Sequence, residues 1–276
     1  MFTLSQINVF PVKSLDGYSP SKAIVEPQGL QYDRRWMITD EAGIFLTRRT
    51  IRKMTGLRAE IAGDWLWIAS KTDANNSISI GINDSSGSLN VKVWDDRVKA
   101  FSVSTTADDF LSDFLGVKCR LVKLDDKADR QIDRKYAPEG AFVSFADAFP
   151  FMIIGSSSFA DLNIRLENKL QSCSARFRPN FVFEGGLPYC EDHWKMVKIG
   201  DTIFSGRKNC GRCVMINVDP DTGESSSEPL NTLASYRKSG NSIQLGRHMC
   251  LGSPFRTKAE YSYVRVGDEI EVLTVS

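Results

Sequence analysis

The 276-residue sequence lacks the features that mark several common functional classes. Its 35 basic residues are balanced by 34 acidic ones, so the formal net charge is only +1 and no overall attraction to nucleic acid is expected. No apolar run approaches the roughly 20 residues that a membrane-spanning helix needs. The N-terminus also lacks the basic start and long apolar stretch of a secretory signal. We therefore expect a cytoplasmic protein with neither a nucleic-acid nor a membrane partner.

Cysteine and histidine are also sparse. Six cysteines are too few for a disulfide framework in a chain of this length, so most are expected to be free thiols. The two histidines, His193 and His248, leave few options for histidine-based chemistry. Both are expected in turns or loops, and neither is expected to be essential. The sequence contains no phosphate-binding loop, Rossmann glycine pattern or nucleophile elbow, and no pyridoxal phosphate site is expected.

Short segments rich in β-branched and aromatic residues dominate what is present, and they predict strands. These strands are expected at residues 4–12, 23–25, 35–38, 65–68, 91–93 and 100–103. Apolar spacing with suitable start and stop residues predicts three helices. They are expected at residues 108–115, 158–170 and 229–238. Residues 71–90 are rich in Ser, Asn, Asp and Gly, which predicts loops and hairpin connections.

The order of these segments predicts two domains. Residues 197–203 and 264–270 each place a Gly-Asp pair between apolar residues, which predicts two hairpins. The charged stretch 123–139 is the expected junction, because a new apolar segment and a new helix follow it. We expect an α+β protein dominated by antiparallel sheet, with domains at 1–125 and 126–276.

One cysteine pair, Cys210-Gly-Arg-Cys213, has a spacing that suggests chemistry. A thioredoxin-like redox pair would precede a helix, whereas residues 214–218 are expected to form a strand. A structural zinc site could instead combine both cysteines with Cys190 and His193.

A third interpretation is that Cys213 alone binds a soft metal centre as a thiolate. The neighbouring Arg212 would favour the deprotonated sulfur that such ligation requires. Spacing does not decide between this interpretation and zinc.

The surrounding sequence resembles a known family. The pair and the segment after it, CGRCVMINVDPDTG, resemble the cofactor-bearing segment of MOSC proteins, above all the amidoxime-reducing components and their bacterial relatives. The segments FPVKS at 10–14 and YDRRW at 32–36 resemble the N-terminal β-barrel domain of that family. FRPN at 177–180 and EPLNTL at 228–233 resemble the MOSC domain itself, a second β-barrel with peripheral helices. The resemblance covers nearly the whole chain.

The resemblance implies an oxidoreductase that carries molybdenum cofactor in its molybdopterin form. It further implies reduction of small N-hydroxylated substrates, such as amidoximes and N-hydroxylated nucleobases, with electrons from a separate flavin, haem or iron–sulfur protein. Cys213 matches the molybdenum ligand, and Cys210 matches a position that binds no metal. The positions that match pterin- or phosphate-binding residues are Lys13, Ser14, Arg34, Arg178 and Asn180, with Arg212 beside the dithiolene.

The sequence departs from the family at Phe149, where relatives place a small hydroxyl residue before a proline, so one polar contact is missing and a more apolar pocket is expected. The pterin phosphate predicts that Arg34 and Arg178 converge on one anionic site, because guanidinium groups bind such groups bidentately. Two alternatives stay open. One is a sulfur or molybdenum-cofactor carrier that uses Cys213, and the other is a zinc-stabilised β domain.

Overall fold

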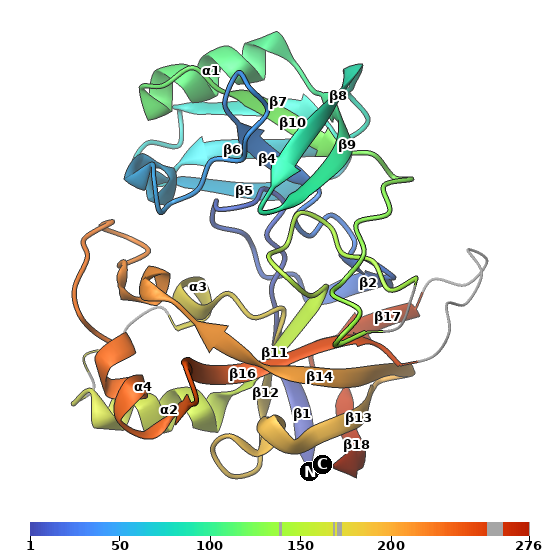
Figure 1. The fold of residues 1–276 in the computed structure, drawn as a ribbon, viewed down its shortest axis with the longest axis vertical. Coiled ribbons are helices and arrows are strands. Elements are labelled where there is room, and N and C mark those ends of the chain that lie inside the picture. The colour runs from blue at the N-terminus through green and yellow to red at the C-terminus, as the bar shows by residue number, and fades with distance from the viewer. Residues whose placement is uncertain (138–139, 168, 170–172, 253–261, 276) are drawn as a thin grey trace.

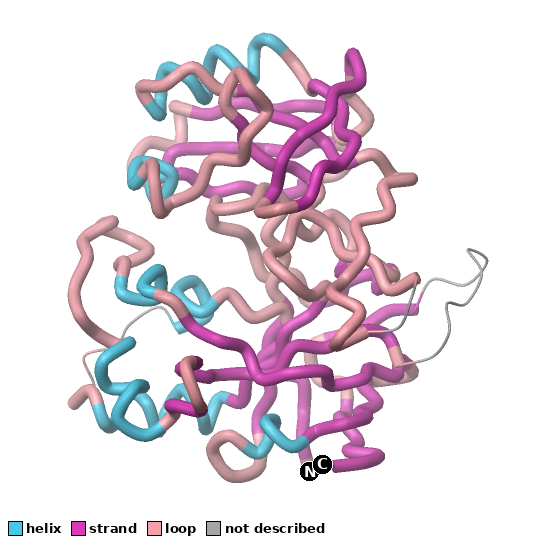
Figure 2. The backbone as a smooth tube through the Cα atoms, viewed as in Figure 1, coloured by secondary structure: helices cyan, strands magenta, loops and turns pink. Residues whose placement is uncertain are grey.

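A computed structural model describes residues 1–137, 140–167, 169, 173–252 and 262–275. Two bodies are stacked along the long axis of the molecule, and loops connect them (Figures 1 and 2). The upper body contains one four-stranded sheet, in the order β4-β10-β9-β8, and one three-stranded sheet, β5-β6-β7. Its elements are β4 (Trp36–Thr39), η1 (Arg52–Gly56), β5 (Leu57–Ala62), β6 (Trp65–Ser70), β7 (Ser77–Gly81), β8 (Ser86–Val93), β9 (Asp96–Ser102), α1 (Thr105–Leu115) and β10 (Arg120–Leu124).

The lower body is a barrel. In the described part of the chain, its strands follow the order β11-β12-β1-β18-β13-β14-β16, and β11 pairs with β16 to close the ring. Its strands are β1 (Phe2–Ile7), β11 (Phe151–Gly155), β12 (Phe181–Glu184), β13 (Trp194–Ile199), β14 (Thr202–Arg212), β16 (Ser242–Leu251) and β18 (Glu269–Val275). The pairing of β11 with β12 is parallel, whereas the others are antiparallel. This confirms an α+β fold with mostly antiparallel strands.

Short elements surround the barrel. Helices α2, α3 and α4 lie on one side of it (Figure 2), and a small β17-β2-β3 sheet lies between the bodies (Figure 1). Their bounds are β2 (Lys22–Glu26), β3 (Gly29–Leu30), α2 (Ser156–Arg165), α3 (Cys173–Phe177), η2 (Cys190–His193), η3 (Val214–Asn217), α4 (Leu230–Tyr236), β15 (Lys238–Ser239) and β17 (Ser262–Arg265). Among the described residues, no helix is long and apolar enough to cross a membrane.

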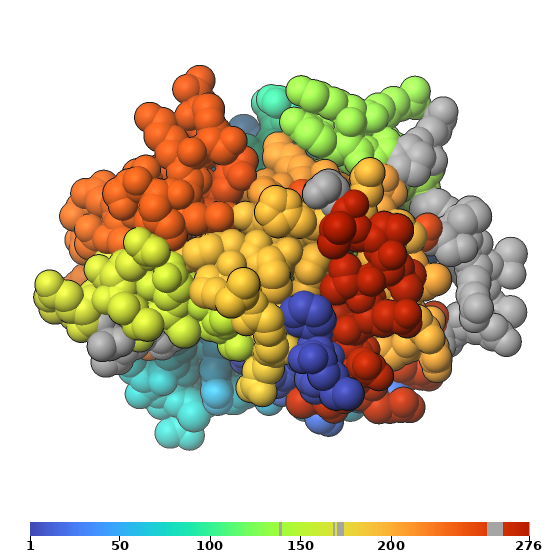
Figure 3. Space-filling model, turned by 90° about the horizontal axis from the view of Figure 1, so that it is seen from below, coloured from blue at the N-terminus to red at the C-terminus, as the bar shows by residue number. Residues whose placement is uncertain are grey.

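Aromatic packing fills the barrel. Phe151, Phe181 and Phe204 are fully buried, and their ring centroids lie 5.1–5.9 Å apart. Burying a side chain of this size contributes roughly 1.5–3 kcal/mol. The first and last strands lie side by side because β1 pairs with the start of β18 (Figure 3). The first strand therefore belongs to the same barrel as the second half of the chain, and the division at residue 125 stays a prediction.

Several expected elements are confirmed. Helices form at Thr105–Leu115, Ser156–Arg165 and Leu230–Tyr236. Helix α1 ends at Leu115 and is capped by Gly116, whose φ of 75° suits a residue without a Cβ. Leu170, the expected end of the second helix, lies outside the described residues. The hairpin predicted at 197–203 is also present, with Ile199 opposite Thr202.

Three other expectations were wrong. Residues 71–90 contain β7 and most of β8, because polar residues suit strands with one solvated face. Residues 264–270 form no hairpin, since β17 pairs with β2 whereas β18 pairs with β13 and β1. Residues 214–217 form a short 3-10 helix rather than a strand, because β14 ends before them at Arg212.

Candidate functional site

Cys210 and Cys213 have opposite surroundings. Cys210 lies within β14. Its side chain is buried in an apolar cluster with Phe177 and Leu245, and burial raises the pKa of its thiol. Cys213 follows the end of β14 and is exposed. Only Cys213 is therefore available to a ligand from outside the protein.

The four residues of the expected zinc site lie in separate places. Cys190 packs against the aromatic core of the barrel, whereas Cys210 belongs to a different cluster. His193 is exposed at the end of η2, as expected of a turn residue. In the described ranges, no three His, Cys, Asp or Glu side chains gather in a way that could hold a metal ion. The geometry gives the zinc interpretation no support.

Arg49 is the cation that contacts Cys213. Its Nη2 lies 3.5 Å from Sγ of Cys213, and its guanidinium stacks on the indole of Trp94 with the ring centroid 4.8 Å away. Sequence reasoning missed both residues, since Arg49 lies in an ordinary polar segment, 164 residues from the cysteine. An arginine beside an exposed tryptophan has no local signature.

Trp94 and Lys13 meet at one carboxylate. Trp94 Nε1 donates to Oδ1 of Asp147 at 3.2 Å, and Lys13 Nζ donates to the same oxygen at 2.5 Å. Lys13 is buried, and this burial lowers its pKa although Asp147 opposes the shift. Desolvation alone would raise the pKa of Asp147, but Lys13 and Arg49 lower it, so this carboxylate is charged at neutral pH. The Asp147 side chain is still 62% exposed, and Trp94 connects it to Arg49, the residue that contacts Cys213.

Arg34 and Arg178 come together, as expected. Their guanidinium carbons lie 4.4 and 4.1 Å from the centroid of the Phe10 ring, and Nη2 of Arg34 donates to the Arg178 carbonyl at 3.3 Å. Burial and the neighbouring Arg48 and Arg34 lower the pKa of Arg178. Within the described structure, Nη1 of Arg178 is buried without a hydrogen-bond partner. A buried donor of this kind calls for an explanation, and an anionic ligand supplies one.

Backbone strain gathers at the same residues. Ser14, Arg34 and Arg178 have φ values of 68°, 52° and 56°, which are uncommon for residues other than glycine. Such conformations cost on the order of 1–3 kcal/mol each and persist where the surrounding structure holds them. Three of the residues expected to bind the cofactor therefore have backbones held in strained conformations.

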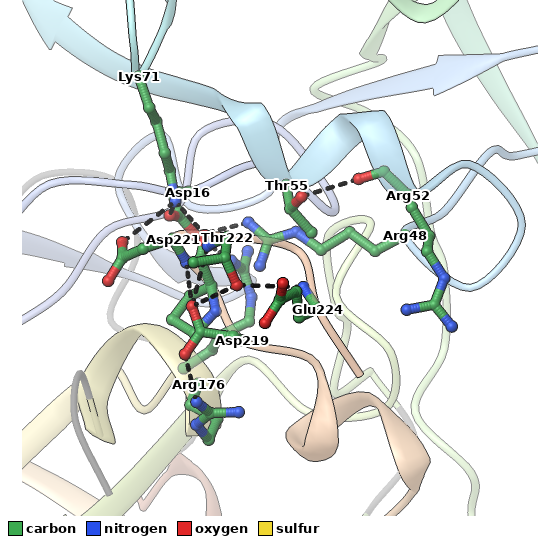
Figure 4. Close-up of polar contacts among 12 residues, drawn as sticks. Asp16, Arg48, Arg52, Thr55, Lys71, Arg176, Asp219, Asp221, Thr222 and Glu224 are labelled. Carbon is green, nitrogen blue, oxygen red and sulfur yellow. Dashed lines mark hydrogen bonds and ion pairs between the residues drawn. The ribbon is translucent and has the colours of Figure 1, made fainter. Parts of the chain in front are cut away.

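Asp16 connects this cluster to the rest of the site (Figure 4). It accepts a hydrogen bond from Arg48 at 2.5 Å, pairs with Lys71 and lies 3.6 Å from Nη1 of Arg178. Arg48 also donates to the Ser14 carbonyl at 2.6 Å. Burial would raise the pKa of Asp16, but these three cations lower it.

The same network joins the two bodies. Lys71 Nζ, from the upper body, donates to the Pro220 carbonyl at 2.6 Å, and Arg52 Nη1 donates to the Gly223 carbonyl at 3.4 Å. On the other side, Arg176 pairs with Asp219 at 2.9 Å (Figure 4). Lys71 and Arg52 thus hold the loop that follows Cys213 against the upper body, and Arg176 holds it against α3.

Asn180 and Arg212 support the site through hydrogen bonds to the backbone. Asn180 Nδ2 donates to the Asn8 carbonyl at 3.3 Å. Arg212 donates to the carbonyls of Phe177 and Leu245, each at 2.9 Å through a different nitrogen. Because these donors point to backbone oxygens, the two residues hold the segments that carry Arg178 and Cys213.

Phe149 lies in a core rather than beside an open pocket. It is 6% exposed and stacks on His248, with ring centroids 4.7 Å apart. His248 lies in β16, not in a loop as expected from the sequence, because the strand continues to Leu251. Burial, followed by the charges of Arg212 and Lys208, lowers the pKa of His248 to about 3, so this ring is neutral.

A cavity of about 370 Å³ adjoins the arginine cluster. Phe10 and Asp16, which contact Arg178, form part of its wall, and polar side chains of Asn8, Ser19 and Ser174 form another part. This volume and polarity suit a small polar ligand. A second cavity of about 410 Å³ lies by Arg176 and Asp219.

Comparison with known proteins agrees with this geometry. Residues 1–118 match the model of the MOSC N-terminal beta barrel domain, and residues 141–271 match that of the MOSC domain. The mouse protein named mitochondrial amidoxime-reducing component 1 is 30% identical over 98% of this chain and 82% of its own length. The chain belongs to the MOSC family.

Other MOSC relatives are named for a different role. A rice protein named molybdenum cofactor sulfurase is 31% identical over 88% of this chain, and the Arabidopsis protein of that name has the same identity and coverage. The chain spans about a third of the length of these sulfurases, 32% in each case. The family is therefore related to the molybdenum cofactor, and its relatives carry more than one activity.

Proposed function

We propose that this MOSC protein binds molybdenum cofactor in its molybdopterin form and reduces N-hydroxylated compounds with electrons from a separate protein. Two observations carry the proposal: Cys213 is exposed, and the strained, largely buried arginine cluster includes a donor, Nη1 of Arg178, that makes no hydrogen bond among the described residues and lies 3.6 Å from Asp16. The amidoxime-reducing relative, which matches nearly the full chain, supports the reaction class. A cytoplasmic location stays a prediction from the sequence.

The two ends of the site suit the two ends of such a cofactor. At one end, Arg178 and Arg34 offer guanidinium donors to a phosphate, and Ser14 lies on the same network. A charge-assisted hydrogen bond there would contribute roughly 1.5–3 kcal/mol. At the other end, the Cys213 thiolate is the soft ligand that molybdenum requires. Lys13 lies between them, because it contacts Asp147 and directly precedes Ser14.

The reaction balances with two electrons and two protons. Cleavage of the N–O bond leaves an N–H group and releases water. When bound, the metal centre supplies the two-electron exchange. Arg49 provides a cation beside Cys213, and Trp94 connects it to the Asp147 carboxylate; these charged groups would orient the polar N–OH group. Trp94, 37% exposed, restricts the approach from the side of the upper body.

Metal analysis of the purified protein tests the cofactor. We expect one molybdenum and one pterin per chain, together with reduction of benzamidoxime by a strong artificial reductant. Protein that is made in molybdenum-replete cells, yet contains neither, would overturn the proposal. Stoichiometric zinc would return the four-residue metal site to consideration.

A second test concerns the electron donor. The purified chain should not reduce benzamidoxime with NADH alone, because the family implies an external electron-transfer protein. Adding a flavin or iron–sulfur reductase system should restore turnover. Robust NADH-driven turnover by the isolated chain would contradict this prediction and reveal a flavin site within the chain.

The sulfurase relatives favour one alternative, a carrier that holds sulfur on Cys213 as a persulfide. The exposed thiol suits this chemistry as well. Mass spectrometry of the purified chain distinguishes the two functions. A gain of one sulfur atom on Cys213, without molybdenum, would favour the carrier.

A further inference from the structure

Arg49 is an exposed cation beside Cys213 that acts on Asp147 at a distance, because its charge helps to lower the pKa of that carboxylate. Its Nη2 lies 3.5 Å from Sγ, and the side chain is exposed. Among the described residues, no carboxylate forms an ion pair with Arg49, although arginines 34, 48, 130, 176 and 237 each have one. Its charge is therefore available to an incoming ligand.

Trp94 holds Arg49 in place. The indole forms the tip of the two-residue hairpin between β8 and β9, where Val93 is opposite Asp96. Its φ of 56° is a genuine outlier for a bulky residue. Tight hairpin turns favour Asn or Gly at such positions. A tryptophan there is strained, and strain that the structure maintains points to a function for the side chain.

Three contacts fix the direction of the indole. Arg49 stacks on it at 4.8 Å, the Phe45 ring centroid lies 4.9 Å away, and Nε1 donates to Asp147. The hairpin belongs to the upper body, whereas Asp147 lies close to β11 of the barrel. Trp94 therefore aligns Arg49 with Cys213 only when the two bodies are in contact.

We propose that Arg49 is the recognition residue of the Cys213 entrance and that Trp94 is its positioning residue. The guanidinium attracts and orients a ligand oxygen that carries negative charge or accepts hydrogen bonds strongly. For the identity of the substrate this rests on the proposed function, in which the oxygen is that of the N–OH group. The attraction itself is a property of the chain and can be measured without cofactor.

Paired alkylating reagents measure this attraction. Iodoacetate is anionic and iodoacetamide is neutral, and the same thiolate attacks the CH2 carbon of each and displaces iodide, so the ratio of their rates cancels differences in thiol ionisation. The full chain would be produced in cells that lack molybdenum cofactor, and labelling of Cys213 followed by peptide mass spectrometry. Relative to wild type, R49Q should lower the iodoacetate-to-iodoacetamide ratio about fivefold, as expected for one unit charge near 4 Å in water.

Three further variants complete the design. R49K should keep most of the wild-type ratio. W94L should give a ratio between those of wild type and R49Q, because the charge of Arg49 remains but the indole on which it stacks is gone. R58Q is the matched control, since Arg58 is also exposed and stacks on a tryptophan, Trp67, at 4.8 Å. Its ratio should equal that of wild type. Thermal unfolding checks that each variant is folded.

Three outcomes would overturn the proposal in whole or in part. An unchanged ratio in R49Q would show that the cation does not act on ligands at Cys213. An equal fall of the rate ratio in R49Q and R58Q would assign the effect to the overall electrostatic field of the protein rather than to Arg49. A wild-type ratio in W94L would remove the positioning role of Trp94.

The loaded enzyme gives a separate measurement. Per molybdenum bound, R49Q should raise KM for benzamidoxime several-fold with a smaller change in kcat, because the lost contact serves binding. If the wild-type chain contains no molybdenum and reduces no substrate, the proposed function fails, yet the labelling ratio still decides the role of Arg49.

Discussion

Cys210 and Cys213 lie three residues apart, yet the structure gives them opposite surroundings. Cys210 is 6% exposed within the apolar cluster behind β14, whereas Cys213 follows the strand and is exposed beside Arg49. The end of β14 lies between them, at Arg212, whose guanidinium donates to buried carbonyls. A motif of two cysteines therefore need not act as a pair, because a strand end is enough to assign one to packing and the other to chemistry.

The largest expected effect comes from replacing each cysteine in turn. Cys213→Ala should abolish benzamidoxime reduction and remove molybdenum, because no other exposed cysteine lies in the described part of the chain. Cys210→Ala should retain both, since its thiol faces the apolar cluster. Activity and metal content of the two variants, measured side by side, test the comparison. Complete loss in both would contradict the single-ligand model.

The arginine end sharpens the comparison by separating pterin binding from metal binding. Arg178→Ala should reduce cofactor affinity by roughly 10- to 100-fold, as expected from losing a charge-assisted hydrogen bond. Cys213→Ala should instead retain pterin while losing the metal. Fluorescence of the released pterin measures occupancy. Arg165→Ala, which removes an exposed ion pair on α2, is the control and should leave occupancy unchanged.

A smaller effect is expected on the stability of the barrel. Cys210→Ala should lower the free energy of unfolding by about 0.5–3 kcal/mol, the usual range for a point change. Cys213→Ala should change it less, because that side chain is exposed. Urea denaturation of the cofactor-free chains provides the measurement. A larger loss for Cys213→Ala would reverse the assignment of packing and chemistry.

The smallest expected effect is a pH dependence of the stability difference between wild type and Cys210→Ala. Burial raises the pKa of the Cys210 thiol above its ordinary value of 9.0. The contribution of the buried, neutral thiol to the free energy of unfolding is therefore fully present below pH 9.0. It is lost as the pH rises through the folded pKa. The stability advantage of wild type over Cys210→Ala should shrink between pH 8 and 10, by at most about 1.4 kcal/mol per pH unit. A difference that is constant over this range would mean that the thiol is not desolvated.

The local sequence predicted those helices and hairpins that depend only on neighbouring residues. The helix at 105–115 follows from its apolar spacing and Gly116, and the hairpin at 197–203 from its Gly-Asp turn. The second Gly-Asp segment, 264–270, has the same local pattern but lies where the chain passes from one sheet to another. Pairing partners far along the chain decided that difference, and no local pattern encodes them.

The sequence by itself determined the family, the predominance of antiparallel strands, and the expectation that Cys213 differs from Cys210. It also indicated Arg34 and Arg178, because each lies in a short contiguous motif, YDRRW or FRPN. Only the tertiary structure decided that Arg49 and Trp94 meet Cys213 and that Asp147 joins Trp94 to Lys13. The reason is physical. These side chains come from separate loops and strand ends, and only the packing of the upper body against the barrel brings them within hydrogen-bonding distance.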